Sequence, residues 1–300
     1  MIETAMGSAQ TWECDAMGHM NVQFYVARAT DGLAALGLAL GFGAPRDGLG
    51  LVAEDHHIRY LREVRPGVCL TVWGGVLAIE GDSLRAYQEI RNTASGLVQA
   101  TFIIEAGLYD LASRTRRPLP AGAREAAKRL LVELPDHGAP RGLARTPPRP
   151  TPTWDEADRL GLPLTAQGVV GMADCDQHGF MVTRGNMGRV ADGLPNLIAK
   201  TRGIDRSEDD GYGSAALEYR FVFRSAPRAG DLLALRSGLK GIGAKTVNWV
   251  QWLFDRASGQ AVATAESINV NFDLVRRKSM PIGDEQRRAL ARHIVPGLSL

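Results

Sequence analysis

Two aspartates stand at matching places in the sequence and could each serve as a general base or a nucleophile. Asp15 lies within residues 12–20 and Asp176 within residues 173–181. A carboxylate can attack a carbonyl carbon or activate water, and unpaired amides at a helix start can hold the oxyanion that forms. An aspartate just before a helix is also common as a surface cap, so the residue type alone leaves both interpretations open.

These aspartates belong to an internal repeat. Residues 4–33 and 165–194 align at a constant offset of 161, and 11 of the 30 positions are identical, where chance would give roughly two. The identical positions of the first copy are Thr4, Ala5, Gly7, Cys14, Asp15, Gly18, Met20, Arg28, Asp31, Gly32 and Leu33. A second block follows at an offset of 163, where Arg65 and Gly67 match Arg228 and Gly230. The same order of matches predicts a duplicated domain.

The Pro-rich stretch around residues 140–152 lies between the copies and is typical of an extended, semi-rigid linker. We therefore expect one domain over residues 1–135, a linker over 136–160 and a second domain over 161–300. In the first copy the pattern predicts a strand over 4–12 and a helix that starts after the N-cap Asn21 and is ended by Gly37 and residues 41–45. Strands are then expected over 51–61, 68–77, 84–91 and 97–108. One long helix followed by strands on short turns indicates an α+β fold with an antiparallel sheet.

Composition excludes several classes of protein. The 300 residues are 45% hydrophobic and carry a net charge of +2, which argues against disorder and against a dedicated nucleic-acid binder. No apolar run is long enough for a membrane span, and we find no signal peptide. Three cysteines make a poor disulfide framework, so a cytoplasmic protein is expected.

The segment 15–21, Asp-Ala-Met-Gly-His-Met-Asn, and the segment 57–67 together resemble the hotdog-fold thioesterases, and most closely the 4-hydroxybenzoyl-CoA thioesterase-like branch. Residues 174–180, Asp-Cys-Asp-Gln-His-Gly-Phe, are similar to a variant of the same motif. The resemblance implies two hotdog domains, each a sheet wrapped around one helix, fused as an intrachain pseudo-dimer. It also implies that hydrolysis of an acyl-CoA to free acid and thiol is the reaction.

The resemblance carries the family's catalytic aspartate onto Asp15 and Asp176, and its oxyanion amide onto Val22 and Thr183. The free amides of Val22 and Gln23 are expected to point out of the helix start. The remaining catalytic candidates, which shape the two turns or position the reacting groups, are Gly18, His19, Asn21 and Gly179. The candidates for substrate binding are Tyr25, Glu63, Phe180 and Lys245.

Structural alternatives stand beside several of these assignments. His19 could be a satisfied, partly buried histidine, Asn21 an ordinary N-cap, and Glu63 an edge-strand charge that discourages aggregation. Lys245, with Lys240, lies on a glycine-containing turn between two strands and could be a solvated surface cation. Because the second copy lacks His19 and Asn21, catalysis at Asp176 is the weaker prediction.

We do not expect residues 174–178 to form a metal cluster, because their side chains alternate in direction and the first copy has no equivalent of His178. We therefore expect no metal and no cofactor other than the coenzyme A of the substrate. We expect no nucleic-acid or membrane partner, and a homodimer of the fused chain is possible. Two alternatives stay open: a hotdog hydratase or dehydratase acting on an acyl-CoA, and a non-catalytic module that binds acyl thioesters.

Overall fold

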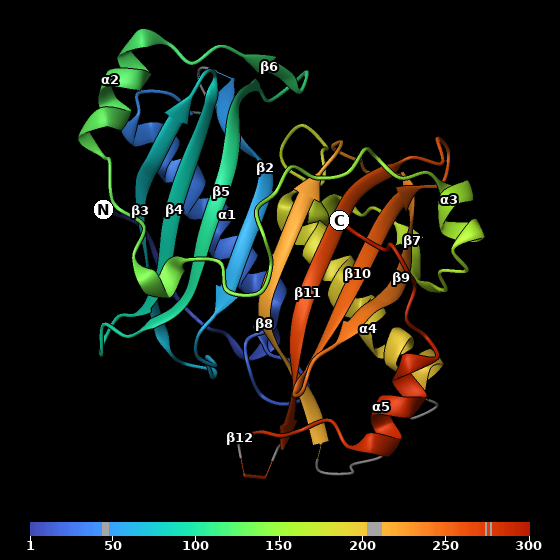
Figure 1. Ribbon diagram of the computed structural model, residues 1–300. Coiled ribbons are helices and arrows are strands. Elements are labelled where there is room, and N and C mark those ends of the chain that lie inside the picture. The colour runs from blue at the N-terminus through green and yellow to red at the C-terminus, as the bar shows by residue number, and fades with distance from the viewer. Residues whose placement is uncertain (44–47, 203–211, 274, 277) are drawn as a thin grey trace. The chain divides into compact units, whose positions relative to one another are not determined.

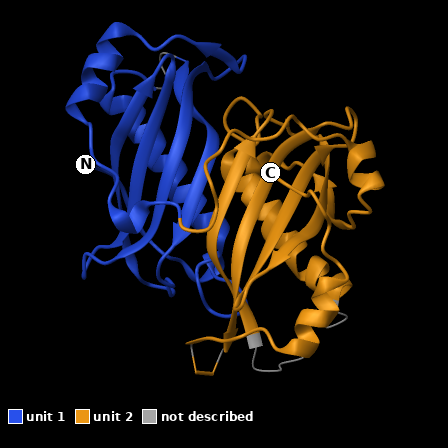
Figure 2. Cartoon of the chain, viewed as in Figure 1, with its two compact units in different colours: residues 1–140 blue, residues 141–300 orange. Residues whose placement is uncertain are grey.

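The computed structural model describes residues 1–300 except 44–47, 203–211, 274 and 277. It divides into two compact units, residues 1–140 and 141–300 (Figure 2). The division falls inside the segment 136–160 that the sequence predicts as a linker. Each unit therefore takes up part of that segment as its own structure.

Unit 1 contains an antiparallel sheet with the strand order β1-β3-β4-β5-β2, and β6 pairs with β5. Its elements are β1 (Ile2–Ser8), the short 3₁₀ helix η1 (Thr11–Glu13), α1 (Val22–Ala39), β2 (Leu49–Tyr60), β3 (Cys69–Glu80), β4 (Ser83–Asn92), β5 (Val98–Asp110), β6 (Thr115–Arg117), α2 (Ala121–Arg129) and the 3₁₀ helix η2 (Asp136–Gly138). The long helix α1 packs against β1, β2, β3 and β4, and Figure 1 shows it behind the labelled strands of the sheet.

Unit 2 repeats this plan, with the strand order β7-β9-β10-β11-β8 and β12 paired to β11. Its elements are α3 (Trp154–Arg159), β7 (Leu164–Val169), the 3₁₀ helix η3 (Met172–Asp174), α4 (Thr183–Arg202), β8 (Tyr212–Phe223), β9 (Leu232–Ile242), β10 (Thr246–Asp255), β11 (Ala261–Asp273), β12 (Lys278–Ser279) and α5 (Asp284–Ala291). The matching order confirms that each copy is an α+β unit with an antiparallel sheet on one long helix.

Helix α1 starts where the sequence predicts and ends slightly later. Asn21 is the N-cap, and its side chain accepts a hydrogen bond from the Gln23 amide at 3.1 Å. Gly37 lies inside the helix. The helix ends in a Schellman motif, in which Gly41 has φ +91° and the Phe42 amide donates to the Gly37 carbonyl at 3.1 Å. Gly41 therefore ends the helix and Gly37 does not.

The predicted strands all form, with ends shifted by one to three residues in β2 to β5. The exception is the expected strand over 4–12, which stops at Ser8. Beyond it the Gln10 backbone amide donates to the Glu13 carboxylate at 3.0 Å and closes η1. This side-chain hydrogen bond gives the backbone an alternative to the sheet, so the chain turns before it reaches Asp15.

Several identical residues of the repeat lie where the helix meets the sheet. A Cβ atom on Gly32 would stand 3.0 Å from Val72 Cγ1 and 3.1 Å from Thr4 Oγ1. On Gly193, the matching glycine of α4, a Cβ atom would stand 2.5 Å from Leu235 Cδ2. The helix thus approaches the sheet closely at one glycine in each unit, which explains these identities by packing alone.

The segment 136–160 is held to the units and is not a free linker. In unit 1, Arg59 Nη1 donates to the carbonyls of His137 and Ala139 at 2.8 and 2.9 Å. In unit 2, Arg220 of β8 donates to the carbonyls of residues 144 and 146 at 2.8 and 2.7 Å. The segment also contains η2 and α3.

In the part of the chain that the structure describes, no helix is both long and apolar enough to cross a membrane.

Candidate active site

The Asp15 carboxylate sits in a tight turn between η1 and α1. Its Oδ1 atom accepts hydrogen bonds from the amides of Met17 at 2.9 Å and His19 at 3.3 Å. Gly18 takes φ +72°, and its amide donates to the Asp15 carbonyl at 2.9 Å. Among the described residues, no donor bonds to the second oxygen, Oδ2. One oxygen therefore fixes the carboxylate while the other is available for chemistry.

The start of α1 supplies a hydrogen-bond donor beside this turn. Val22 is the first residue of the helix, and its amide finds no acceptor within the described chain. The Gln23 amide, which the sequence also predicts to be free, is instead occupied by the Asn21 side chain. The prediction of two free amides is thus wrong for Gln23, because a capping asparagine takes one of them. Val22 can still donate to an oxyanion, and the positive end of the helix dipole adds to that potential.

His19 and Glu63 come together at the same turn. His19 is buried, and its Nε2 atom lies 3.5 Å from Oε2 of Glu63, whose side chain is 40% exposed. The Met20 amide donates to the Val64 carbonyl at 2.8 Å and ties the turn to the chain after β2. The pair places an imidazole and a second carboxylate next to Asp15.

Tyr25 lies in the core of unit 1. Its ring packs edge-on against Tyr60, with 5.2 Å between ring centroids, and its hydroxyl donates to the Arg62 carbonyl at 3.5 Å. Burial raises the pKa of Tyr25 well above its ordinary value, so the phenol stays protonated. Only 3% of the residue is exposed, so Tyr25 supports the turn from beneath and leaves little surface for a ligand.

The Asp176 turn of unit 2 repeats the backbone of the first. Asp176 Oδ1 accepts from the amides of His178 at 2.9 Å and Phe180 at 3.1 Å, and Gly179 takes φ +78°. Thr183 begins α4, as Val22 begins α1. In place of the imidazole, the Phe180 ring lies under the Arg228 guanidinium, 4.3 Å from its centroid. Unit 2 therefore keeps the anchored carboxylate and lacks the histidine–glutamate pair.

An ion pair that the sequence reasoning missed holds η1 against α1. Arg28 Nη2 lies 2.9 Å from both carboxylate oxygens of Glu13, whose side chain is 8% exposed. In unit 2, Arg189 lies 4.0 Å from Asp174. The sequence contains a signal for this ion pair, because Arg28 is identical in both copies and its partner is acidic in both. The pair fixes the segment that leads into Asp15.

The neighbouring cysteines are poor nucleophiles. Cys14 Sγ lies 3.3 Å from the Gln10 carbonyl, and burial, assisted by the nearby carboxylates, raises the pKa of its thiol. The same causes raise the pKa of Cys175. Within the described ranges, no group of three His, Cys, Asp or Glu side chains could hold a metal ion.

Lys245 is not brought to the Asp176 turn within unit 2. That turn lies at the start of β9, where the Ala229 amide donates to the Gly179 carbonyl. Lys245 follows the other end of the strand, roughly 35 Å away at the rise of a β-strand. Lys240 is paired with Glu266 at 2.7 Å.

The comparisons with known proteins identify the family of the chain. A family model described as the thioesterase-like superfamily matches residues 9–130 and 170–290, one match in each unit. No curated protein matches the chain.

Solved structures share the fold along nearly the whole chain. An acyl-ACP thioesterase from Bacteroides thetaiotaomicron is 11% identical and has a TM-score of 0.64, with 88% of this chain and 96% of that one covered. The 12:0-ACP thioesterase from Umbellularia californica is 11% identical with a TM-score of 0.64, covering 89% and 93%. A protein of Lactobacillus plantarum, provisionally assigned as an oleoyl thioesterase, is 13% identical with a TM-score of 0.65, covering 89% and 94%. At these identities the likeness establishes the fold, in agreement with the expected tandem hotdog domains.

Proposed function

The chain belongs to the thioesterase-like superfamily, and from this premise we propose that it hydrolyses an acyl-CoA to the free acid and coenzyme A at the Asp15 turn. The proposal rests mainly on the different environments of the two oxygens of the Asp15 carboxylate. Oδ1 is fixed by two backbone amides, and Oδ2 has no donor among the described residues. A carboxylate held in this way is pre-oriented for attack and loses little freedom in the transition state.

The reaction needs few groups, because a thioester carbonyl is already activated by its sulfur leaving group. Asp15 either takes a proton from a water that attacks the carbonyl carbon or attacks that carbon itself and forms an anhydride that water then opens. The carbonyl oxygen gains negative charge, which the Val22 amide stabilises. When the C–S bond breaks, the thiolate leaves and takes up a proton. The steps require no metal and no redox cofactor.

His19 and Glu63 position the turn in this scheme. Their contact at 3.5 Å lies next to the His19 amide that bonds to Asp15 Oδ1. A shift of the imidazole would therefore move the carboxylate. Unit 2 has a phenylalanine at this place, so we assign the reaction to unit 1.

The acyl group could be carried by coenzyme A or by acyl carrier protein, and an assay can compare the two carriers directly. Two of the structures that share the fold along the whole chain act on acyl-ACP, which makes acyl carrier protein the second candidate carrier. We place the protein in the cytoplasm, where both carriers occur, and a homodimer of the fused chain and the pseudo-dimer packing of its units stay predictions.

Release of free thiol from a panel of acyl thioesters tests the function. We expect turnover of at least one acyl-CoA, with the acyl-ACP of the same chain length assayed in parallel to identify the carrier. Asp15→Ala should abolish thiol release. Hydration of an enoyl-CoA without thiol release would instead indicate a hydratase. Binding of every acyl thioester without release would indicate a binding module, and either result would overturn the proposal.

A further inference from the structure

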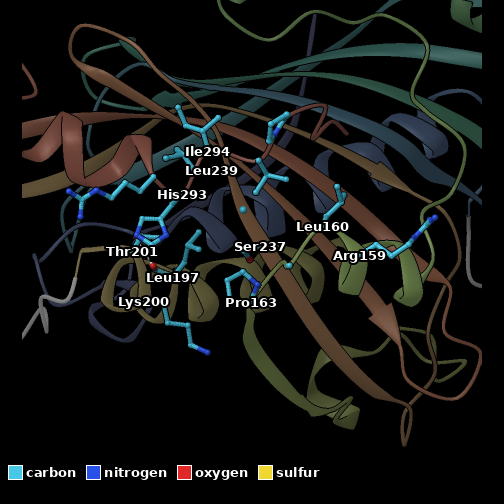
Figure 3. A pocket seen from close by; sticks show the side chains of 15 residues that line it. Arg159, Leu160, Pro163, Leu197, Lys200, Thr201, Ser237, Leu239, His293 and Ile294 are labelled. Carbon is cyan, nitrogen blue, oxygen red and sulfur yellow. Dashed lines mark hydrogen bonds between the residues drawn. The ribbon is translucent and has the colours of Figure 1, made fainter.

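Unit 2 contains a pocket of about 580 Å³ that the proposed reaction does not use (Figure 3). Its walls come from the end of α3, the last turns of α4, strand β9 and the chain that follows α5. Leu197 of α4 lies 14 residues after Thr183, so the pocket is roughly 20 Å from the Asp176 turn along the helix. Its volume falls in the range of small-molecule sites.

The charged residues around this pocket are all basic. Arg159, Lys200, Arg292 and His293 line it, and none of the 15 lining residues is acidic. In Figure 3, His293 lies beside Leu197 and Thr201, and the long side chains of Arg159 and Lys200 extend at the rim. Within the described chain none of these four basic side chains has a carboxylate within ion-pair distance. Lys200 Nζ donates to the Leu164 carbonyl at 2.9 Å, an uncharged acceptor that orients the ammonium.

Unit 1 provides an internal control for this charge. Leu239 of β9 bridges Ile294, as Val76 of β3 bridges Leu131, so the segments after α5 and α2 correspond at an offset of 163. At that offset His293 stands where unit 1 has Leu130, and Pro296 where it has Glu133. In the long helices, Lys200 stands where unit 1 has Ala39. Unit 2 thus has two basic side chains where unit 1 has apolar ones, and a proline where unit 1 has a glutamate.

Helix ends account for only part of this difference. A cation at a helix C-terminus is favourable because it offsets the negative end of the dipole. Arg292 is the C-cap of α5, and the matching Arg129 is the last residue of α2, so both lie at a helix C-terminus. Lys200 and His293 have no basic counterparts in unit 1, where Ala39 and Leu130 stand at the matching positions. Their convergence with Arg159 on one pocket therefore needs another cause.

We propose that this pocket binds a small organic anion, with a phosphate or carboxylate group among the four basic side chains and a short apolar body against the aliphatic wall. That wall includes Leu197, Leu239 and Ile294. The site consists of residues of unit 2 alone and does not depend on the thioester reaction. A dianion should bind more tightly than a monoanion, because each added charge meets unpaired cations.

Calorimetric titration of the full chain with hexyl phosphate, hexanoate and hexanol tests the proposal. We expect one equivalent of hexyl phosphate to bind more tightly than hexanoate, and hexanol not to bind. Lys200→Ala combined with Arg292→Ala should weaken hexyl phosphate binding at least tenfold. Arg276→Ala combined with Lys278→Ala is the matched control, since it removes two exposed cations from the β11–β12 turn and should change the affinity less than twofold.

All four substituted residues are exposed, so the variants should fold like the parent, which circular dichroism checks. Tighter binding of hexanoate would assign the acidic group as a carboxylate and keep the pocket. Saturation by neither anion, or equal affinity in the Lys200 and Arg292 double variant, would overturn the inference.

Discussion

At the scale of single residues, the aspartates of both turns have a structural role, and for Asp15 we propose a chemical role as well. Each carboxylate closes its turn through Oδ1, so the identity of Asp15 and Asp176 in the repeat follows from backbone geometry alone. What distinguishes the copies is the neighbouring residue, His19 in one and Phe180 in the other. The feature that indicates a reaction is therefore a difference between the copies and not their identity.

His56 on β2 should make the stability of the protein depend on pH. It is buried, faces α1 beside Phe102, and burial lowers its pKa from 6.5 to about 3. Below pH 6.5 His56 becomes protonated in the unfolded chain but stays neutral in the folded chain. The free energy of unfolding therefore decreases as the pH falls toward 3. At pH 5 the loss is about 2 kcal/mol, at 1.36 kcal/mol per pH unit.

Urea unfolding at pH 7.5 and pH 5.0, with wild type and His56→Leu, measures this term. The variant should lose less stability than the wild type between the two pH values, because leucine does not titrate. An equal loss in both proteins would assign the acid sensitivity to other groups.

At the scale of elements, the ion pair between Arg28 and Glu13 should stabilise unit 1 more than its counterpart stabilises unit 2. Arg28→Ala leaves the nearly buried Glu13 carboxylate without its cation, which should cost about 3 kcal/mol. Arg189→Ala should cost about 1 kcal/mol or less, because Asp174 is more exposed and keeps Arg184 at 2.9 Å. Chemical unfolding of the two variants compares these costs, and equal losses would contradict the assignment.

The close approach of α1 to its sheet predicts an unusual response to a small substitution. Alanine for glycine inside a helix usually stabilises by about 1 kcal/mol. At Gly32 the new methyl group would press on Val72, Thr4 and Gln88 at 3.0–3.1 Å, and two of these are stiff β-branched residues. Gly32→Ala should therefore lower the melting temperature.

Gly122→Ala in α2 is the control for this substitution, because a Cβ atom there would meet nothing within 4 Å. It should leave the melting temperature unchanged or raise it slightly. A rise of equal size in both variants would show that the helix does not lie as close to the sheet as described.

Local signals in the sequence predicted much of this fold. Asn21 and Gly41 mark the ends of α1 through cap chemistry, and Gly18 marks the turn through its positive φ, all of which depend on neighbouring residues. The contacts that could not be predicted join distant residues. Arg59 reaches residues 137–139, and Glu63 lies beside His19 only because the chain returns after β2. The composition of a Pro-rich segment does not indicate which surface of the domain it packs against.

At the scale of the whole molecule, the duplication provides two copies of one scaffold, and the polar side chains of each copy could change independently. Unit 1 carries the histidine–glutamate pair beside its aspartate, and unit 2 carries a basic pocket at the other end of its helix. The family match covers both units, so the scaffold is shared while the polar side chains differ. We therefore expect the two turns to contribute unequally to activity.

The most direct test of the account compares Asp15→Asn with Asp176→Asn in the thiol-release assay. An asparagine oxygen can still accept the two amide hydrogen bonds of each turn, so both variants should keep the wild-type melting temperature, while the base or nucleophile is lost. We predict that Asp15→Asn lowers kcat by about 100-fold or more and that Asp176→Asn stays within a few-fold of wild type. Wild-type turnover in a folded Asp15→Asn variant would contradict the assignment of the reaction to the Asp15 turn.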